Sequence, residues 1–366
     1  MSSLRTRRFH PGDEVQIREL LIKVKRGDSA IWQKSLELMR WKWFHAPGGP
    51  MDSWLIENEE PDGSWKIVGH HGLCPTRFTF GDQDLLCAKT TNTMLLPEYR
   101  SKFLYLRFER ECLQEADKRF DATYSCAAGT TRLRKALGYT GDSVWIHMVR
   151  GLQTPEMISR LLGLAVSRYP SASWDKIKRG VATVSSSANQ KPSLSLAEYS
   201  SSEAPKSAFF MDFWNSARSS AGISPRRDVA DLSWRFWQRP DFQYSTLTYT
   251  WADGARAYCV INITNPLVFY LEDIFVVPRR ADLLEEFITA VFAWSAQRGS
   301  LLLRFSTTTD GQPVEFLDVF TQHMYLPPLR RFRPKMEFPR RISPQGRLKM
   351  RNGGWPWNAT LLLRPA

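Results

Sequence analysis

The chain has 366 residues, more than one hydrophobic core usually serves, and 43% of them are apolar, which predicts two packed domains. No stretch approaches the roughly 20 apolar residues of a membrane span, and no apolar region follows the basic residues of Met1 to Phe9. Five scattered cysteines without a CxxC pair and six histidines without metal-ligand spacing predict reduced thiols, a cytoplasmic location, no metal site and no membrane partner.

The first half begins with a strand pattern at residues 5–9, followed by a helix at 14–25 for which Asp13 is a suitable N-cap. Strand patterns follow at 54–57, 66–74 and 85–96, with turns at Asp62-Gly63 and Gly81-Asp82. A charged helix with an apolar stripe then leads to a strand at 122–126. A short helix ends this half near Leu137-Gly138-Tyr139.

The second half repeats these features in the same order. The residues Trp41-Lys42-Trp43-Phe44-His45-Ala46-Pro47 match Trp234-Arg235-Phe236-Trp237-Gln238-Arg239-Pro240, and Asn92 to Pro97 match Asp273 to Pro278. In both halves an arginine, a helical pattern, a strand and a short helix ending near an aromatic residue follow. Four shared features in one order indicate two homologous domains.

The predicted boundaries place one domain at 1–150, a connecting helix and Ser-rich linker at 151–204, and a diverged copy at 205–366. The order β-α-β-β-β-α-β-α is unlike a doubly wound dinucleotide fold, and no GxGxxG follows a strand. We expect an α/β (α+β) protein.

Several of these motifs resemble the GNAT N-acetyltransferase superfamily. They are Arg7 to Asp13, Ile67-Val68-Gly69-His70, Leu95 to Arg100 and Leu137-Gly138-Tyr139, and the repeat with its Trp-Lys-Trp-Phe motif resembles the tandem branch, which is often associated with modifying amino sugars or other small amines. The resemblance implies two tandem GNAT-like domains, each a mixed, mainly antiparallel central sheet flanked by helices. It also implies an N-acyltransferase that moves an acyl group from acetyl-CoA or another acyl-CoA to the primary amine of a small polar metabolite such as an amino sugar or amino acid derivative.

In that family the strand before the proline splays from its neighbour and pairs with the pantetheine amides, and the following loop holds the pyrophosphate at a helix N-terminus. The resemblance therefore assigns donor binding to two consecutive segments. They are Asn92, Thr93, Met94 and Leu95 on the strand, and Arg100, Ser101, Lys102, Phe103, Leu104 and Tyr105 on the loop and helix start.

The loop departs from the family pattern Arg/Gln-x-x-Gly-x-Gly/Ala, because Phe103 and Tyr105 replace its small residues. Arg134 stands where the family often has a tyrosine that protonates the departing thiolate. Three interpretations stay open. The chain is an acyltransferase that binds CoA unconventionally, a transferase whose donor is an acyl carrier protein or an aminoacyl-tRNA, or a binding or scaffold protein that keeps the fold without activity.

The candidate catalytic bases are His70, His71 and Glu57. The two histidines are adjacent on one predicted strand, so they face opposite sides of the sheet and at most one serves as the base. An imidazole with an ordinary pKa near 6.5 suits removal of an ammonium proton. A structural histidine and a carboxylate at the rim of the site are the competing interpretations.

The candidate substrate-binding residues are Trp41, Trp43, His45 and Asp273, although packing is the favoured explanation of the tryptophan motif, because the motif recurs in a half that is not expected to be catalytic. The net charge is +13, and the segment Arg330 to Arg351 carries nine basic residues against one acidic residue. This strip is either a solvated loop or a surface for an anionic partner such as tRNA or a carrier protein.

Overall fold

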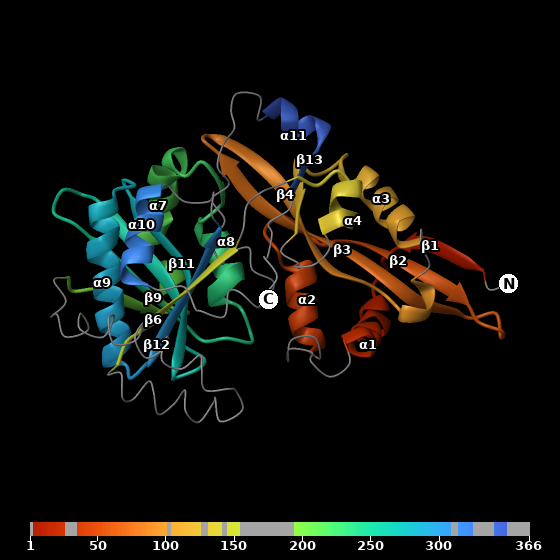
Figure 1. Cartoon of the computed structure of the whole chain (residues 1–366), viewed down its shortest axis with the longest axis horizontal. Helices are drawn as coiled ribbons and strands as arrows, with labels where there is room; N and C mark the ends of the chain where they lie inside the picture. The colour runs from red at the N-terminus through yellow and green to blue at the C-terminus, as the bar shows by residue number, and fades with distance from the viewer. Residues whose placement is uncertain are drawn as a thin grey trace, which may run out of the picture.

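The computed structural model describes residues 3–25, 35–100, 104–125, 131–140, 145–153, 194–308, 314–324 and 340–349. These residues form two lobes, each with a central sheet flanked by helices (Figure 1). Both sheets are mixed and mainly antiparallel, which confirms the predicted fold class.

The first sheet has the strand order β1-β2-β3-β4-β5-β13, with β8 pairing β3 beside this path. The strands are β1 (Leu4–Arg8), β2 (Asp52–Glu59), β3 (Trp65–Phe80), β4 (Gln83–Leu95), β5 (Ala122–Tyr124), β8 (Ile223–Pro225) and β13 (Arg340–Ile342). Gly81, at φ +55°, makes the tight turn between β3 and β4. All these pairs are antiparallel except β4–β5, which is parallel because α3 crosses over between the two strands.

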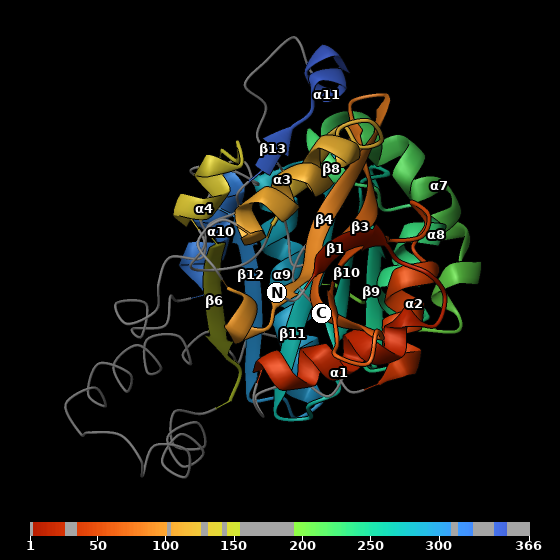
Figure 2. The same cartoon turned by 90° about the vertical axis from the view of Figure 1, so that its right-hand side faces the viewer.

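Helices cover both faces of this sheet. On β3, His70 stacks on Trp43 of α2 (Leu36–Phe44), whereas His71 contacts Phe108 of α3 (Leu104–Ala116). Adjacent strand residues point to opposite faces, so α2 and α3 lie on opposite sides. Helix α1 (Asp13–Lys25) packs beside α2, and α4 (Thr131–Ala136) lies beside α3 (Figure 2).

The second sheet has the order β6-β12-β11-β10-β9-β7. Its strands are β6 (Trp145–Gly151), β7 (Ala197–Ser200), β9 (Tyr244–Thr250), β10 (Arg256–Asn262), β11 (Val268–Val277) and β12 (Leu302–Thr308). Cys259 and Ile261 of β10 pack with α9 (Ala281–Gln297) and α10 (Val314–His323), whereas Tyr258 and Val260 pack with α7 (Ala208–Ala217) and α8 (Val229–Leu232). This two-residue alternation buries both faces of the sheet.

The two halves exchange strands across the predicted boundaries. Strand β6 begins within residues 1–150 and ends at Gly151, yet it pairs with β12 in the second sheet. Strand β13 falls within residues 205–366, yet it pairs with β5 in the first sheet. Strand β7 lies in the predicted linker but pairs with β9. Strand pairing is set by contacts between distant segments, so local composition did not reveal this exchange.

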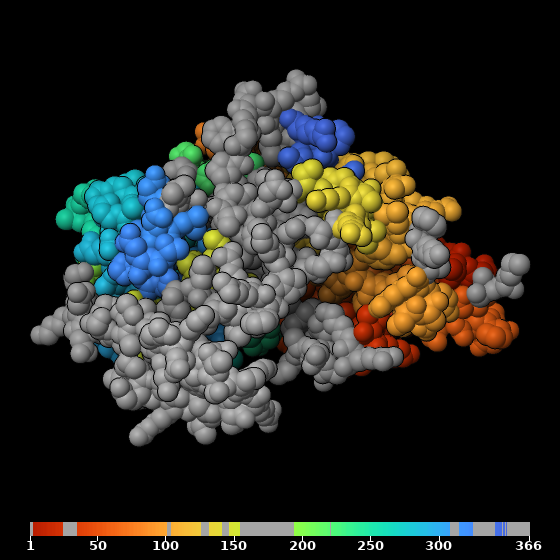
Figure 3. All heavy atoms as spheres, in the orientation of Figure 1, coloured from red at the N-terminus to blue at the C-terminus, as the bar shows by residue number. Residues whose placement is uncertain are grey.

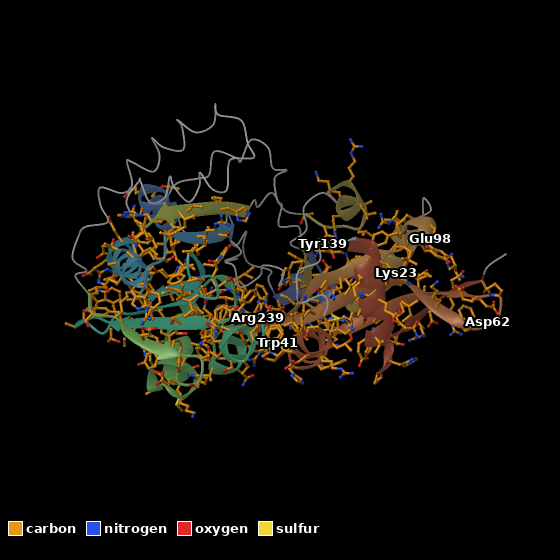
Figure 4. All side chains as sticks on the ribbon, turned by 90° about the horizontal axis from the view of Figure 1, so that it is seen from below. Lys23, Trp41, Asp62, Glu98, Tyr139 and Arg239 are labelled. Atoms are coloured by element: carbon orange, nitrogen blue, oxygen red, sulfur yellow. The ribbon has the colours of Figure 1, made fainter. Side chains whose placement is uncertain are left out.

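Equivalent residues of the repeat meet where the lobes touch. Trp41, near the end of α2, stacks on Trp234 in the π-helical turn η6 (Ser233–Trp237), with ring centroids 5.4 Å apart. Arg239 lies over the Trp41 ring at 5.8 Å, and Figure 4 shows these two side chains together at the junction. Contact between matching residues is the signature of a two-fold relation, here between domains of one chain.

A second set of contacts ties β3 to the other lobe. Beside the β3–β8 ladder, Arg77 pairs with Asp228 at 3.0 Å and with Asp231 at 2.6 Å. Arg226 pairs with Asp84 at 3.1 Å. The half-buried arginine–carboxylate pairs and the β3–β8 ladder therefore both stabilise the junction between the lobes.

Some predictions fall on other parts of the chain. A connecting helix at 154–169 and a last strand at 359–363 lie outside the described residues. The four described cysteines, Cys74, Cys87, Cys112 and Cys259, are free and buried, as predicted. Within the described ranges, none of the helices has the length and apolarity needed to cross a membrane.

Candidate functional site

The parallel strands β4 and β5 pair over a short distance and then part. Their register joins Cys87 to Ala122, Ala88 to Thr123 and Lys89 to Tyr124. Among the described residues, this ladder ends at Lys89, while β4 continues to Leu95. Within the described ranges no strand pairs with this edge of β4 beyond Lys89, and we call residues 90–95 the free edge of β4. An edge without a strand partner suits pairing with an extended ligand, and the residues predicted for the splayed strand lie in this stretch.

A β-bulge interrupts β4 within this free stretch. His70 pairs with Met94 and Gly72 with Thr91, so Asn92 and Thr93 together oppose His71. Asn92 has φ +50°, a left-handed conformation that asparagine tolerates better than most residues. Bulges redirect backbone groups and are frequent next to active sites. The predicted residues Asn92, Thr93, Met94 and Leu95 therefore form one irregular strand segment.

His70 supports the bulge from the α2 side of the sheet. Its Nδ1 lies 2.7 Å from the Asn92 carbonyl oxygen, and its Nε2 lies 2.6 Å from Ser53 Oγ. A carbonyl oxygen accepts hydrogen bonds, so Nδ1 carries the proton and Nε2 accepts from the Ser53 hydroxyl. Burial lowers the pKa of His70 to about 4, which keeps the ring neutral at pH 7. Both nitrogens of His70 are already engaged.

His71 faces α3 and has one uncommitted nitrogen. Its Nδ1 lies 3.1 Å from Thr93 Oγ1 in the bulge, whereas its buried Nε2 has no hydrogen-bond partner among the residues that the structure describes. Burial, assisted by the charge of Arg134, lowers its pKa to about 3. Such a nitrogen is able to accept a hydrogen bond from a water or a ligand group. Of the two histidines, His71 is the one with a free ring nitrogen.

Glu57 does not have the surroundings of a general base. Arg5 binds its carboxylate at 2.8 Å and Arg7 at 2.7 Å, and Arg7 also pairs with Asp13. Burial raises the pKa of Glu57, but the hydrogen bonds and charges of Arg7 and Arg5 outweigh this effect and hold the pKa below its usual value. The carboxylate of Glu57 joins β1 to β2 through two ion pairs, so its surroundings suit a structural role better than that of a general base.

A charged pair lies on the same side of the sheet as His71. Glu109 of α3 is completely buried and bonds Arg134 of α4 at 2.5 Å. Tyr105 also bonds Glu109, and burial raises the pKa of this tyrosine, so its phenol stays protonated. Glu109 was not among the residues predicted for the site, although an acid at 109 within the apolar spacing 108-112-113-116 was a usable signal.

The predicted donor loop is described in part. Arg100 is the exposed C-cap residue of the short helix η2 (Pro97–Tyr99), which follows β4. Its Nε donates a hydrogen bond to the Leu95 carbonyl oxygen at 3.0 Å. Ser101, Lys102 and Phe103 lie outside the described residues. Leu104 and Tyr105 open α3 and pack against the main core of the first lobe. The structure therefore brings Arg100 and the start of α3 to the end of the bulged strand.

The predicted substrate-binding residues do not converge on this segment. Trp41 lies at the junction of the lobes, and Trp43 is buried with its ring 5.6 Å from His70. His45 is exposed at the C-cap of α2. Asp273 lies in the second lobe, fully buried, 3.0 Å from Arg227, and it accepts a hydrogen bond from Tyr258. Only a rearrangement of the core would let Asp273 touch a substrate.

The equivalent place in the second lobe is closely packed. Strands β11 and β12 also part, after Leu271 and Phe305, and a bulge at Glu272 precedes Asp273. A cavity of about 10 Å³ remains there, lined by Ile274, Phe275, Val276, Arg279, Leu284, Phe316 and Phe320. Arg279 packs between the rings of Phe275 and Phe316. This volume holds no more than a single water.

Comparisons with solved structures identify the fold. A conserved protein of unknown function from Enterococcus faecalis V583, described as a probable N-acyltransferase, aligns with 94% of this chain and 73% of its own, at 11% identity and TM-score 0.62. A GCN5-related N-acetyltransferase from Anabaena variabilis aligns with 93% of this chain and 73% of its own, at 14% identity and TM-score 0.56. Saccharomyces cerevisiae N-myristoyltransferase with bound myristoyl-CoA aligns with 93% of this chain and 82% of its own, at 12% identity and TM-score 0.52.

These alignments span both lobes, so the chain has a GNAT-type fold, as the sequence motifs predicted. No protein-family model and no curated protein matches the sequence. At such low identity the likeness establishes the fold, and function is argued from the site.

Proposed function

We propose that the first lobe is an N-acyltransferase that moves an acyl group from an acyl-CoA thioester to a primary amine at the bulge of β4. The observation that carries this proposal is the free edge of β4 beyond Lys89, with a bulge in it and His71 directly opposite. The named enzymes among the structural neighbours are acetyl- and myristoyltransferases, one of them with its acyl-CoA bound, which supports the donor class.

The chemistry needs few protein groups. The amine loses a proton, attacks the thioester carbonyl and expels the CoA thiolate, which takes up a proton. The free edge of β4 offers backbone groups to the pantetheine amides, and oriented N–H groups stabilise the oxyanion of the tetrahedral intermediate. We assign His71 rather than His70 as the base because its Nε2 has no hydrogen-bond partner among the described residues. Its pKa of about 3 results from complete burial, so the ring becomes an effective base only when the site opens and the imidazole is solvated. His70 positions the bulge through the Asn92 carbonyl.

We place the reaction in the first lobe because at the bulge of the second lobe Val260 and Ile261 of β10, and no histidine, face Asp273 and Leu271. The second lobe fills its equivalent split with Arg279 and phenylalanine rings, leaving about 10 Å³. The acceptor that we propose is a small polar metabolite with a primary amine, such as an amino sugar or an amino acid derivative.

Calorimetric titration with acetyl-CoA, myristoyl-CoA and free CoA tests the donor. We expect micromolar binding of at least one acyl-CoA, weakened by roughly ten- to a hundredfold by Arg100→Gln, because a charge-assisted contact to phosphate contributes about 1.5–3 kcal/mol. The matched control is Arg304→Gln, an exposed arginine in the second lobe. Lack of binding to all three compounds would remove CoA as the donor and direct the search to carrier proteins and aminoacyl-tRNA.

A second candidate function is a scaffold that keeps the fold without activity. The observation that favours it is the burial of both imidazoles, each with no exposed surface. Assays of acyl-CoA hydrolysis and of acyl transfer to a panel of amines distinguish an enzyme from a scaffold. The enzyme should lose at least a hundredfold in rate on His71→Gln with unchanged donor affinity, whereas a scaffold should show no turnover with either protein.

A further inference from the structure

A separate pocket of about 460 Å³ lies at the far end of the α3/α4 layer. Its wall on α3 is the helix face of Arg110, Leu113 and Asp117, and the residues after α4 close another side. Leu113 is nine positions after Leu104, so at 1.5 Å per residue it lies roughly 13 Å along the helix from the proposed donor site. The pocket is therefore distinct from the split between β4 and β5.

The third wall comes from the other half of the chain. Strand β13 and the following helix α11 (Pro344–Lys349) return to the first lobe, and Figure 3 shows α11 against α4 and the atoms of α3. Arg341 forms a two-pronged ion pair with Asp117. Ser343 bonds the Asp121 carbonyl oxygen at 3.0 Å, and Lys349 bonds the Asp121 carboxylate at 3.0 Å. These contacts hold the wall in place, so the pocket is a built feature of the fold.

The pocket carries positive charge that the described residues do not fully neutralise. Three arginines line it, Arg110, Arg341 and Arg347, against the single acid Asp117, which Arg341 already engages. Neither Arg110 nor Arg347 has an acidic partner among the described residues, and both are exposed at the rim. Two guanidinium groups around one opening attract an anion and can bind it in a forked geometry.

The floor of the same pocket is apolar. Leu113 and Leu137 are buried there, and Ala136, Ile342 and Pro344 add further apolar surface. An inorganic ion would leave this floor in contact with water, whereas a ligand with an apolar body would cover it. The volume falls within the range of small-molecule sites.

We propose that this pocket binds an organic anion, with one phosphate or carboxylate group at Arg110 and Arg347 and an aromatic or aliphatic body on Leu113 and Leu137. The basic segment near the C-terminus then has two roles on the first lobe. Arg341 and Lys349 fasten the wall, and Arg347 contacts the ligand.

Fluorescence titration of the full chain with 1-anilinonaphthalene-8-sulfonate tests the proposal, because this probe joins an anionic group to an aromatic body. The matched neutral probe is N-phenyl-1-naphthylamine, which lacks the sulfonate. We expect the double variant Arg110→Gln/Arg347→Gln to weaken the anionic probe at least tenfold and to leave the neutral probe unchanged. The control Lys118→Gln changes an exposed charge on the turn after α3 outside the pocket and should alter neither.

Two further measurements define the occupant. Ala136→Trp, at an exposed position of the lining, should fill the pocket and displace both probes from it. Competition by phenyl phosphate and by benzoate distinguishes a phosphate ligand from a carboxylate ligand. Equal binding of the anionic probe by the wild type and the double arginine variant would overturn the proposal. If CoA displaces the anionic probe from the wild type, and this displacement depends on Arg347, the pocket would belong to the donor site and the proposal of a separate site would be overturned.

Discussion

The buried ion pair of the second lobe gives the sharpest test of the structure. Arg227 and Asp273 have no exposed surface, lie 3.0 Å apart, and share the hydroxyl of Tyr258. Removing one charge leaves the other buried without compensation, which costs about 3–5 kcal/mol. We therefore expect Asp273→Leu to lower the free energy of unfolding by this amount and the Tm by about 10 °C, at roughly 2–4 °C per kcal/mol.

The double variant Arg227→Met/Asp273→Leu distinguishes a charge effect from a packing effect. It removes both charges at similar volume and leaves the Tyr258 hydroxyl without its acceptor, which costs about 1–3 kcal/mol. The double variant should therefore be more stable than Asp273→Leu alone in thermal and urea unfolding. Asp282→Leu, at an exposed pair with Arg280, is the control and should leave the Tm unchanged. A Tm within 2 °C of the wild type for Asp273→Leu, or additive losses in the double variant, would refute the reasoning.

Three further predictions concern the first lobe and the junction. Folding lowers the pKa of His70 from 6.5 to about 4, so the unfolded chain binds the extra proton between these values and stability falls by about 3 kcal/mol as the pH drops through them. The free energy of unfolding in urea should fall less between pH 7 and pH 4 for His70→Asn than for the wild type, and as much for His45→Asn as for the wild type. Equal decreases in all three proteins would contradict the lowered pKa of His70. Trp41→Ala should cost about 1–3 kcal/mol and couple with Trp234→Ala in a double-mutant cycle, whereas independent losses would mean that the two rings do not support each other. Glu57→Gln should lower the free energy of unfolding at pH 7 by about 1–3 kcal/mol. In urea unfolding, this difference from the wild type should shrink as the pH falls below about 4, because the ion pairs that lower the pKa of Glu57 stabilise the fold only while its carboxylate is charged. A difference that stays constant down to pH 2 would argue against the ion pairs.

Part of the candidate site was predictable from sequence. The strand that ends before Pro97 and the alternation of His70 and His71 across β3 follow from two-residue periodicity and proline chemistry. The bulge was not predictable from that periodicity, because the extra residue at Asn92–Thr93 becomes visible only against its partner strand. The ranking of His71 over His70 depends on Ser53 and the Asn92 carbonyl, which come from neighbouring strands.

The roles of Glu57 and Asp273 were also not predictable from local sequence. Each is a carboxylate in a strand pattern, a position that suits a base or a substrate contact. Arg5 and Arg7 reach Glu57 across the β1–β2 ladder, and Arg227 reaches Asp273 from 46 positions away in the chain. Whether a strand carboxylate is a reactive group or half of an ion pair depends on partners that are distant in sequence.

The sequence by itself determined the matching motifs of the two halves, most of the strands and helices of the first half and the α/β class, because these follow from local periodicity and turn residues. The tertiary structure alone decided that β6 and β13 change lobes, that Trp41 meets its own counterpart Trp234, and that the C-terminal segment walls a pocket on the first lobe. These features consist of pairings between residues more than a hundred positions apart. Their free energy comes from burial and hydrogen bonding between distant segments, which local patterns do not record.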